Sequence, residues 1–361
     1  MSAMSGTATE SSILSAADHI FWQEHGYLVV PDVVEPELCA AARADIMEYL
    51  GLDPAARIED YYDKVLGQDR GGFVNVSQSQ ALWDTRQSPR MHKVFAEIHG
   101  THKLYTSIDV AHMKLPFRET VAAGGAVQTW GDGGAYFGPG DARNNDGGLH
   151  WDVHGGGMQD AETVARKKRG EPTGGLWAGA GLTSMLQYGD GYPCDPQGVL
   201  YLNDRDADGG GFRCVPGFHR RFNEWLASVP KDQSLEQKDD GHWLATHPEL
   251  AEYYAEARNI PAQEGSLVIW HRLLPHSNGR NLSDTPRFAQ YISMGPVPDD
   301  PQQQRKRAEA NIDTWQKRGE RWQAALSDDA REARWQQWER SRPPAKLTEL
   351  GKRLVGVVPW D

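Results

Sequence analysis

The sequence predicts a mainly β protein with flanking helices, whose strands form a sandwich or a barrel. After residue 103, short β-prone runs are separated by Gly, Pro, Asp and Asn, which is the pattern of strands joined by turns. Apolar residues at helical spacing occur at both ends of the chain. The runs that we expect to be strands are 104–110, 182–188, 199–203, 211–215, 266–270 and 288–294.

The N-terminal part is predicted to fold as helix, strand, helix. Residues 18–25 carry apolar side chains at helical spacing, and Gly26 follows as a stop signal. Residues 27–31 form a short β-prone run, and residues 35–50 predict a helix with a proline near its first turn. A further amphipathic helix is expected over 86–99, so helices should flank the strands on this side.

The chain is expected to consist of a tail, one domain and an extension. Residues 1–15 are small and polar, which is typical of a mobile tail. Residues 16–299 form the single domain, and residues 300–361 form a helical extension packed on its core. Two stretches within the domain, 124–157 and 170–181, are too rich in glycine for helix. They are either functional loops over a pocket or surface insertions.

The C-terminal extension is rich in charged and helix-forming residues. Residues 302–342 predict two amphipathic helices. Four tryptophans are expected to pack these helices onto the core or onto a second subunit, rather than to contact substrate: Trp315, Trp322, Trp335 and Trp338.

Composition excludes several classes of protein. The 361 residues are 39% hydrophobic and 24% charged, which is ordinary for a soluble globular protein. The net charge of −12 argues against a nucleic-acid surface. No apolar run approaches the roughly 18 residues of a membrane span, and the N-terminus lacks a signal-peptide pattern. Three cysteines cannot form a disulfide framework, so we expect a reducing, cytoplasmic compartment. We also expect a monomer or a homodimer that binds a small-molecule substrate.

The first chemical motif is His150-Trp151-Asp152. In an extended chain, residues i and i+2 point to the same side, so His150 and Asp152 face one way and Trp151 the other. One imidazole and one carboxylate supply two corners of a metal site, and a distant histidine completes the facial triad of non-haem iron(II) enzymes. Such a triplet is weak evidence alone, because it also arises by chance.

The second motif strengthens the first. An apolar strand over 266–270 leads to His276, a Gly/Asn turn follows, and a second strand opens with Arg287. We interpret this as a hairpin that carries His276 and Arg287 on its two strands. A guanidinium pairs bidentately with a carboxylate. Beside iron, the expected partner is the distal carboxylate of 2-oxoglutarate.

Other histidines compete for the metal. His271 lies five residues before His276, so the two should face opposite sides of an extended strand. His154 shares the face of Asp152 and is an alternative ligand or a substrate-side group. His219 is expected to be a structural hydrogen bonder.

Further residues are weaker candidates. Lys114 and Gln128 precede the metal motif and are candidates for contact with 2-oxoglutarate, although each is more often a plain surface residue. Trp151 and Tyr201, together with His154, are candidates for contact with substrate or for support of the site.

From about residue 21 to about residue 296, the sequence resembles the phytanoyl-CoA dioxygenase family. The resemblance implies a double-stranded β-helix (a jelly roll, or cupin-like core), Fe(II), 2-oxoglutarate and O2. It also implies that His150, Asp152 and His276 bind iron and that Arg287 binds 2-oxoglutarate. Asn278 stands where the family often has Ser, and an amide can still bind a carboxylate. The motifs that carry the resemblance are Phe21 with Gly26-Tyr27 and Pro31, His150-Trp151-Asp152, residues 199–203, Pro216-Gly217-Phe218-His219, and His276 with Arg287 eleven residues later.

The resemblance implies a reaction class and leaves the substrate open. We expect hydroxylation of an unactivated C–H bond in a secondary metabolite or an amino-acid-like molecule, with release of succinate and CO2. Related halogenases lack the carboxylate that Asp152 supplies, so hydroxylation is favoured over halogenation. Desaturation, epoxidation and ring formation use the same triad and remain open. Two remoter alternatives are a zinc hydrolase and a non-catalytic cupin-like binding protein. The triad would also suit zinc, but Arg287 has no evident role in a hydrolase, and an intact triad with Arg287 argues against a non-catalytic protein.

Overall fold

The computed structural model describes residues 12–65, 72–121, 127–130, 149, 196–222, 224–225, 251–317 and 336–361. Within them, a six-stranded antiparallel sheet faces a smaller three-stranded one. The large sheet has the order β1 (Tyr27–Val30), β10 (Leu267–Trp270), β7 (Gln197–Tyr201), β12 (Arg287–Tyr291), β4 (Ala111–Lys114) and β2 (Phe73–Val74). The small sheet has the order β11 (His276–Asn278), β8 (Phe212–Cys214) and β9 (Arg258–Asn259). Two further pairs are β13 (Met294–Pro296) with β3 (Leu104–Thr106), and β5 (Arg118–Val121) with β6 (Val127–Trp130).

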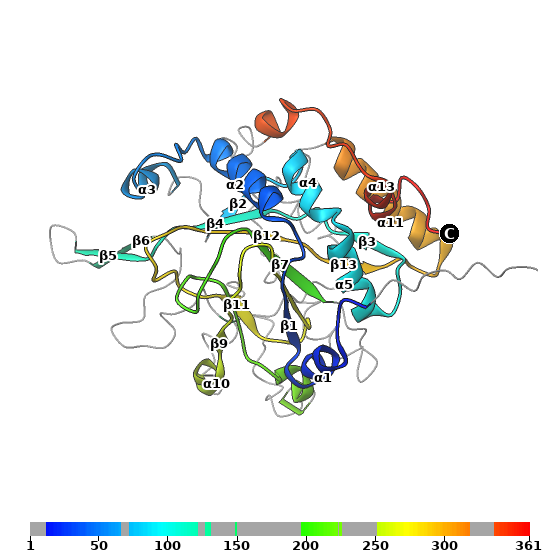
Figure 1. Cartoon of the computed structure of the whole chain (residues 1–361), viewed down its shortest axis with the longest axis horizontal. Coiled ribbons are helices and arrows are strands. Elements are labelled where there is room, and N and C mark those ends of the chain that lie inside the picture. Colours follow the sequence, from blue (N-terminus) through cyan, green and yellow to red (C-terminus); the bar gives the residue numbers. More distant parts are fainter. Residues whose placement is uncertain are drawn as a thin grey trace, which may run out of the picture.

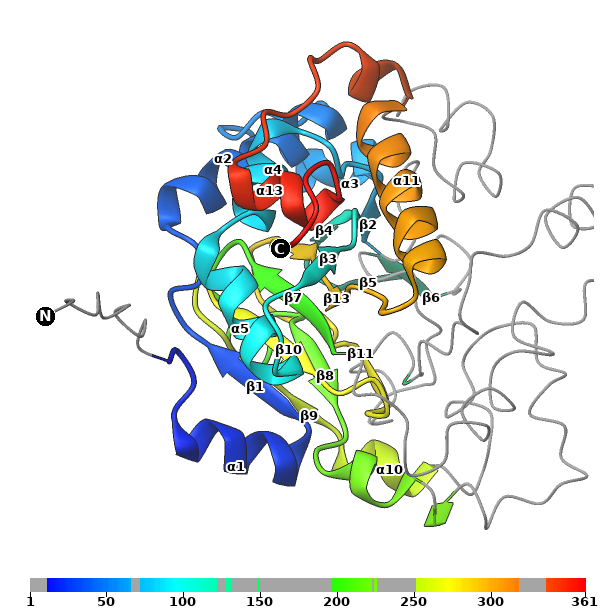
Figure 2. The ribbon, with the colours of Figure 1, turned by 90° about the vertical axis from the view of Figure 1, so that its right-hand side faces the viewer.

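Most of the described helices cover the large sheet on the face opposite the small sheet. Figure 1 shows α2 and α4 above β4 and β12, while β11 and β9 lie below together with α1 and α10, and Figure 2 shows the same arrangement from the side. A mainly β fold with flanking helices and a jelly-roll core is thereby confirmed. The described helices are α1 (Ala16–His25), α2 (Pro36–Leu50), α3 (Glu59–Val65), α4 (Gln80–Arg86), α5 (Pro89–His99), α10 (Ala251–Glu256), α11 (Pro301–Lys317) and α13 (Glu349–Val355), with the short 3-10 turn η3 (Phe218–Arg220).

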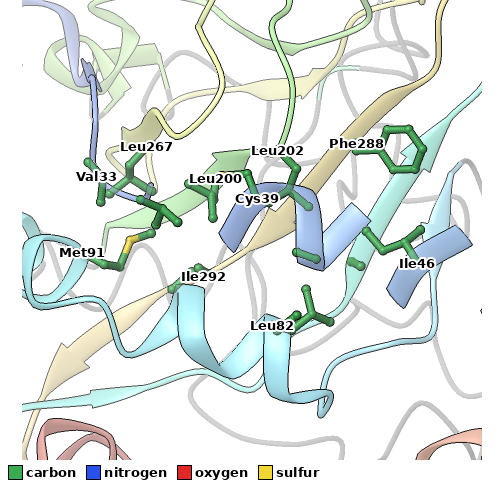
Figure 3. Packing of buried hydrophobic residues seen from close by; sticks show 14 of the residues in the cluster. Val33, Cys39, Ile46, Leu82, Met91, Leu200, Leu202, Leu267, Phe288 and Ile292 are labelled. Carbon is green, nitrogen blue, oxygen red and sulfur yellow. The ribbon is translucent and has the colours of Figure 1, made fainter. Parts of the chain in front are cut away.

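Strand alternation divides the buried residues into two cores. On β7, Leu200 packs toward the helices, whereas Val199 and Tyr201 point toward the small sheet. We call the first group the helix-side core and the second the interior cluster. Figure 3 shows part of the helix-side core, in which Leu267 and Phe288 from the strands meet side chains of α2, α4 and α5. Burial of each such large apolar side chain stabilises the fold by roughly 1.5–3 kcal/mol.

The predicted N-terminal elements are confirmed at α1, β1 and α2. Helix α1 begins at the Ser15 cap, whose side chain accepts a hydrogen bond from the Asp18 backbone N–H. It ends at Gly26, which has φ of 74°. This left-handed conformation favours glycine and reverses the chain into β1.

The single helix expected over 86–99 is wrong at its start. Helix α4 ends at Arg86, and α5 begins at Pro89 with Ser88 as its N-cap. Pro89 lacks a backbone N–H and restricts the residue before it, so the helix restarts there instead of continuing. The strands expected over 104–110 and 288–294 are likewise shorter than predicted. The strand expected over 182–188 lies outside the described residues, as does the glycine-rich stretch 170–181.

The predicted hairpin between His276 and Arg287 is also wrong. Strand β11 pairs with β8 in the small sheet, whereas β12 pairs with β4 and β7 in the large sheet. The link between them therefore crosses from one sheet to the other. Asn281 fixes this crossing, because its Nδ2 donates to the carbonyls of Lys114 (3.1 Å) and Thr285 (2.8 Å).

The C-terminal segment contacts the helix-side core. Trp338 packs edge-on against Tyr49 of α2, with ring centroids 5.6 Å apart. The buried Glu339 Oε1 accepts hydrogen bonds from the backbone N–H groups of Ser77 (2.9 Å) and Gln78 (3.1 Å). Trp315 Nε1 donates to the carbonyl of Ala345. Trp322 and Trp335 lie outside the described residues.

None of the described helices combines the length and the hydropathy that a bilayer span requires.

Candidate active site

Strand register brings the polar residues of the two sheets to the same interior space. Arg287 lies directly opposite Lys114, and Ala289 lies opposite both His112 and Tyr201. Residues opposite each other in antiparallel strands share a face. Because Ala289 and Tyr201 belong to the interior cluster, Arg287 and Lys114 face that interior too.

The small sheet contributes its own polar residues to this interior. His276 lies opposite Cys214, and Asn278 lies opposite Phe212. Cys214 and Phe212 both belong to the interior cluster, so His276 and Asn278 point toward the large sheet. The jelly-roll interior therefore combines an imidazole from one sheet with two cationic side chains from the other.

His276 is held in one orientation and one tautomer. Its side chain is buried, and its ring stacks on Phe212 at 5.9 Å between centroids and lies 5.1 Å from the Trp270 ring. Its Nδ1 lies 3.0 Å from the Leu274 carbonyl oxygen. A carbonyl only accepts, so Nδ1 carries the proton and Nε2 carries the lone pair. Metal-binding histidines show this arrangement, in which a backbone carbonyl fixes the ring for coordination.

Arg287 presents one edge of its guanidinium to the interior. The side chain is fully buried, and its Nη1 donates to Nδ1 of His112 at 3.1 Å. The Cζ atom of the guanidinium lies 5.6 Å from the centroid of the Tyr201 ring. Within the described part of the chain, Nε and Nη2 have no hydrogen-bond partner. These two atoms form the guanidinium edge whose parallel N–H bonds match the two oxygens of a carboxylate.

Lys114 and Asn278 lie on the interior faces of the two sheets, as Arg287 does. The buried Lys114 Nζ donates to the Gly279 carbonyl at 2.9 Å. Asn278 Nδ2 donates to the Tyr291 hydroxyl at 2.8 Å. Burial raises the pKa of Tyr291, while the positive charge of Arg287 lowers it. The Tyr291 phenol therefore stays protonated and supports the Asn278 amide.

Tyr201 supports the site through its ring and its hydroxyl. The hydroxyl donates to the Ile260 carbonyl at 3.0 Å and accepts the Phe212 backbone N–H at 2.6 Å. Both hydrogen bonds tie the large sheet to the small one. With its hydroxyl engaged by backbone, Tyr201 offers its ring face to Arg287 and is suited to support rather than to substrate contact.

Several expected site residues lie outside the described residues: His150, Trp151, Asp152 and His154, together with the side chain of Gln128. The backbone of Gln128 lies in β6, opposite Thr120. Leu149, directly before His150 in the sequence, is fully buried in the interior cluster. The described residues alone contain no group of three metal-ligating side chains.

Two other histidines, His271 and His219, lie next to each other. His271 and His219 have ring centroids 5.0 Å apart, and His271 also faces Trp22 of α1. His219 Nε2 lies 3.1 Å from the Gln23 carbonyl, which agrees with a structural role. Burial lowers the pKa of His271 to about 4, so it is neutral near pH 7.

Sequence reasoning missed His112 and Tyr291. His112 is fully buried, two residues before Lys114 on β4, so strand alternation from Lys114 would have placed it on the interior face. Tyr291 lies four residues after Arg287 on β12 and shares its face for the same reason. The contact of each with Arg287 or Asn278 depends on pairing between strands distant in sequence, which no local pattern reveals.

The jelly-roll core and its interior residues define the class of a cupin-like dioxygenase fold. A model of the phytanoyl-CoA dioxygenase family matches residues 22–143 and 192–289, which together make up more than half of the chain. The protein therefore belongs to the phytanoyl-CoA dioxygenase family, and its general reaction class is that of a dioxygenase.

Individual relatives are distant. A Dictyostelium discoideum protein named as a phytanoyl-CoA dioxygenase is 23% identical over 292 residues, which cover 77% of this chain and 74% of that protein. The crystal structure of GlcNAc Inducible Gene 2, GIG2 (DUF1479), from Candida albicans has a TM-score of 0.59 at 13% identity, covering 96% of this chain and 77% of its own. The hypothetical protein JW0805 from Escherichia coli, crystallised at high pH, has a TM-score of 0.54 at 16% identity, covering 95% and 81%. These two structures share the fold.

Proposed function

We propose that this protein is an Fe(II)- and 2-oxoglutarate-dependent dioxygenase that hydroxylates a C–H bond of a small molecule. His150, Asp152 and His276 would hold the iron. Arg287, Lys114, Asn278 and Gln128 would bind 2-oxoglutarate. When bound, iron and 2-oxoglutarate use O2 to oxidise the substrate while the oxo acid becomes succinate and CO2.

The observation that carries this proposal is the open edge of Arg287. Within the part of the chain that the structure describes, Nε and Nη2 of this buried cation have no hydrogen-bond partner. A buried charge without a counter-ion costs several kcal/mol, so we expect the fold to bind an anion there. The Nε and Nη2 atoms point to a carboxylate as that anion, and the Nζ of Lys114 adds positive charge on the adjacent strand. A dicarboxylic oxo acid would fit, because its distal carboxylate would pair with Arg287 in the same interior that His276 faces.

The tautomer of His276 supports the metal part of the proposal. With Nδ1 donating to Leu274, the lone pair of Nε2 is directed away from that carbonyl and suits coordination. The position of Leu149 supports a contribution from the His150-Trp151-Asp152 motif, because Leu149 directly precedes His150 and is buried in the same interior cluster that His276 contacts. Neutral imidazole with carboxylate is the ligand set that suits Fe(II) with open coordination positions.

The stacked rings of Phe73 and Tyr291 beside the site support the proposal of an apolar or flat substrate. Phe73 lies opposite His112 in the β2–β4 pair, so its ring is on the interior face, yet it is 42% exposed. It stacks on Tyr291 with centroids 5.5 Å apart. Trp151 and His154 remain candidates for substrate contact. Asp152 favours hydroxylation over halogenation, and desaturation, epoxidation or ring formation would need the same site.

The test is an anaerobic titration of the protein with Fe(II) and 2-oxoglutarate. We expect a weak visible charge-transfer band that requires both additions and is absent in His276→Ala and in Asp152→Ala. His271→Ala is the matched control, because it removes a half-buried imidazole that contacts Trp22 and His219, and it should retain the band. Absence of the band in the wild-type protein at saturating ligand would contradict the proposal.

A further inference from the structure

The guanidinium of Arg287 has two edges that could bind a carboxylate, and His112 contacts an atom of one of them. The end of the guanidinium is formed by Nη1 and Nη2, and its side is formed by Nε and Nη2. The Nη1 atom donates to His112 Nδ1 at 3.1 Å, whereas the two atoms of the side edge, Nε and Nη2, have no hydrogen-bond partner among the described residues. The imidazole thus holds one end of the guanidinium and leaves the side edge available.

This contact also fixes the state of His112. A guanidinium only donates, so Nδ1 must carry a lone pair, and the proton of the neutral ring must be on Nε2. In the opposite tautomer, Nδ1–H would face Nη1–H, and the two donors would repel. The structure therefore links one tautomer of His112 to one rotamer of Arg287.

The surroundings of His112 hold the ring in place. Gly72, with φ of +91°, lies so close that a Cβ built on it would come within 2.7 Å of Nε2 and 2.4 Å of Cε1. The Phe73 ring lies edge-on at 5.2 Å between centroids, and the Tyr291 ring lies edge-on at 5.9 Å. A backbone approach this close leaves the imidazole little room to rotate away from Arg287.

We infer that His112 is a positioning residue for the anion site: it holds Arg287 so that Nε and Nη2 together receive the distal carboxylate of the oxo acid. The inference rests on the proposed function, because it concerns the same ligand. It assigns His112 no contact with the ligand or the metal. It requires an acceptor atom at the position of Nδ1, not an imidazole as such.

Two variants separate an acceptor role from a packing role. His112→Asn keeps an acceptor, because Asn Oδ1 is bonded to Cγ as Nδ1 is in histidine. His112→Leu fills similar space without an acceptor. Binding is measured by anaerobic calorimetry on the Mn(II)-loaded protein. The ligands are 2-oxoglutarate and 2-oxovalerate, an oxo acid of equal chain length with a methyl group in place of the distal carboxylate.

We expect His112→Leu to weaken 2-oxoglutarate binding about tenfold and His112→Asn to weaken it no more than about threefold, as loss or retention of one charged hydrogen bond implies. Binding of 2-oxovalerate should be unchanged in both. Unaltered 2-oxoglutarate binding in His112→Leu, equal losses in both variants, or equal losses for both ligands would each overturn the inference. If the wild-type protein itself does not bind 2-oxoglutarate, the proposed function fails first.

A second measurement does not depend on the leucine variant folding. Long-range proton–nitrogen correlation spectra of the histidine-labelled wild-type protein report which ring nitrogen carries the proton, and comparison with His112→Asn assigns the signal. We expect an unprotonated Nδ1 and a protonated Nε2 for His112. A protonated Nδ1 would overturn the inference.

Discussion

Arg287 and Lys114 lie directly opposite each other on the antiparallel strands β12 and β4, with both side chains buried. Opposite residues have Cβ atoms about 4.5–5.5 Å apart, so the two cationic side chains leave neighbouring strands side by side and enter the same interior. An anion bound in that interior would be attracted by both positive charges.

Lys114→Met tests the second cation of this pair. We expect affinity for 2-oxoglutarate to fall about tenfold, because a charge–carboxylate interaction is worth roughly 1.5–3 kcal/mol. The melting temperature of the ligand-free protein should fall slightly, because the Gly279 carbonyl loses the buried hydrogen bond from Lys114 Nζ. Thermal shift with and without 2-oxoglutarate measures both effects. A variant that binds 2-oxoglutarate like the wild type would exclude Lys114 from the anion site.

Tyr291→Phe tests the support given to Asn278. The variant keeps the ring that stacks on Phe73 but removes the hydroxyl that accepts from Asn278 Nδ2 at 2.8 Å. We expect the free energy of unfolding to fall by about 1 kcal/mol and 2-oxoglutarate affinity to fall several-fold, as the amide loses its fixed orientation. Urea denaturation and calorimetry report the two quantities. Asn278→Ser is the companion variant, and it should retain measurable affinity.

Glu339→Ala tests the attachment of the C-terminal segment. Its carboxylate accepts from two buried backbone N–H groups, of Ser77 and Gln78, which the variant leaves unsatisfied. We expect a loss of about 2–4 kcal/mol in the free energy of unfolding, whereas Glu339→Gln, which keeps one acceptor oxygen, should lose less. Affinity of the folded protein for 2-oxoglutarate should not change. Equal stability of wild type and Glu339→Ala would show that these hydrogen bonds contribute nothing.

His271 should make the fold sensitive to acid. Burial lowers its pKa to about 4, and His219, whose pKa burial also lowers, adds to the effect. Because the unfolded state takes up the proton near the ordinary value of about 6.5, stability is complete above that pH and falls between about pH 6.5 and 4, by up to about 3 kcal/mol. His271→Gln should flatten this decline in urea midpoints measured across the window. An unchanged pH profile would exclude His271 as the source.

The sequence was most informative where function depends on local spacing. The His276 and Arg287 positions, eleven residues apart, predicted that both side chains serve one interior, and both face it. Strand alternation also explains why Lys114 faces Arg287. The hairpin was predicted wrongly because a Gly/Asn-rich link between two strands looks the same whether it closes a hairpin or crosses between sheets. Only the pairing of β11 with β8 distinguishes the two arrangements.

The remainder of the site depends on contacts between strands far apart in sequence. His112 and Arg287 are 175 residues apart, and their hydrogen bond forms only because β4 and β12 pair in one register. Shifting that register by one residue would turn His112 to the helix side, where Met113 packs. No spacing within the sequence specifies that register, so the hydrogen bond between His112 and Arg287 could not be predicted before the pairing of β4 with β12 was known.

The most direct test of the central proposal is a calorimetric comparison of Arg287→Leu with wild type, both loaded with Mn(II) without oxygen. Arg86→Leu, which removes a fully buried guanidinium on the helix side, is the matched control. We predict that Arg287→Leu weakens 2-oxoglutarate binding by about 100-fold, as loss of a bidentate charged pair implies, and leaves 2-oxovalerate binding unchanged. Arg86→Leu should change neither affinity. Equal affinity of wild type and Arg287→Leu for 2-oxoglutarate would contradict the assignment of this interior as an oxo-acid site.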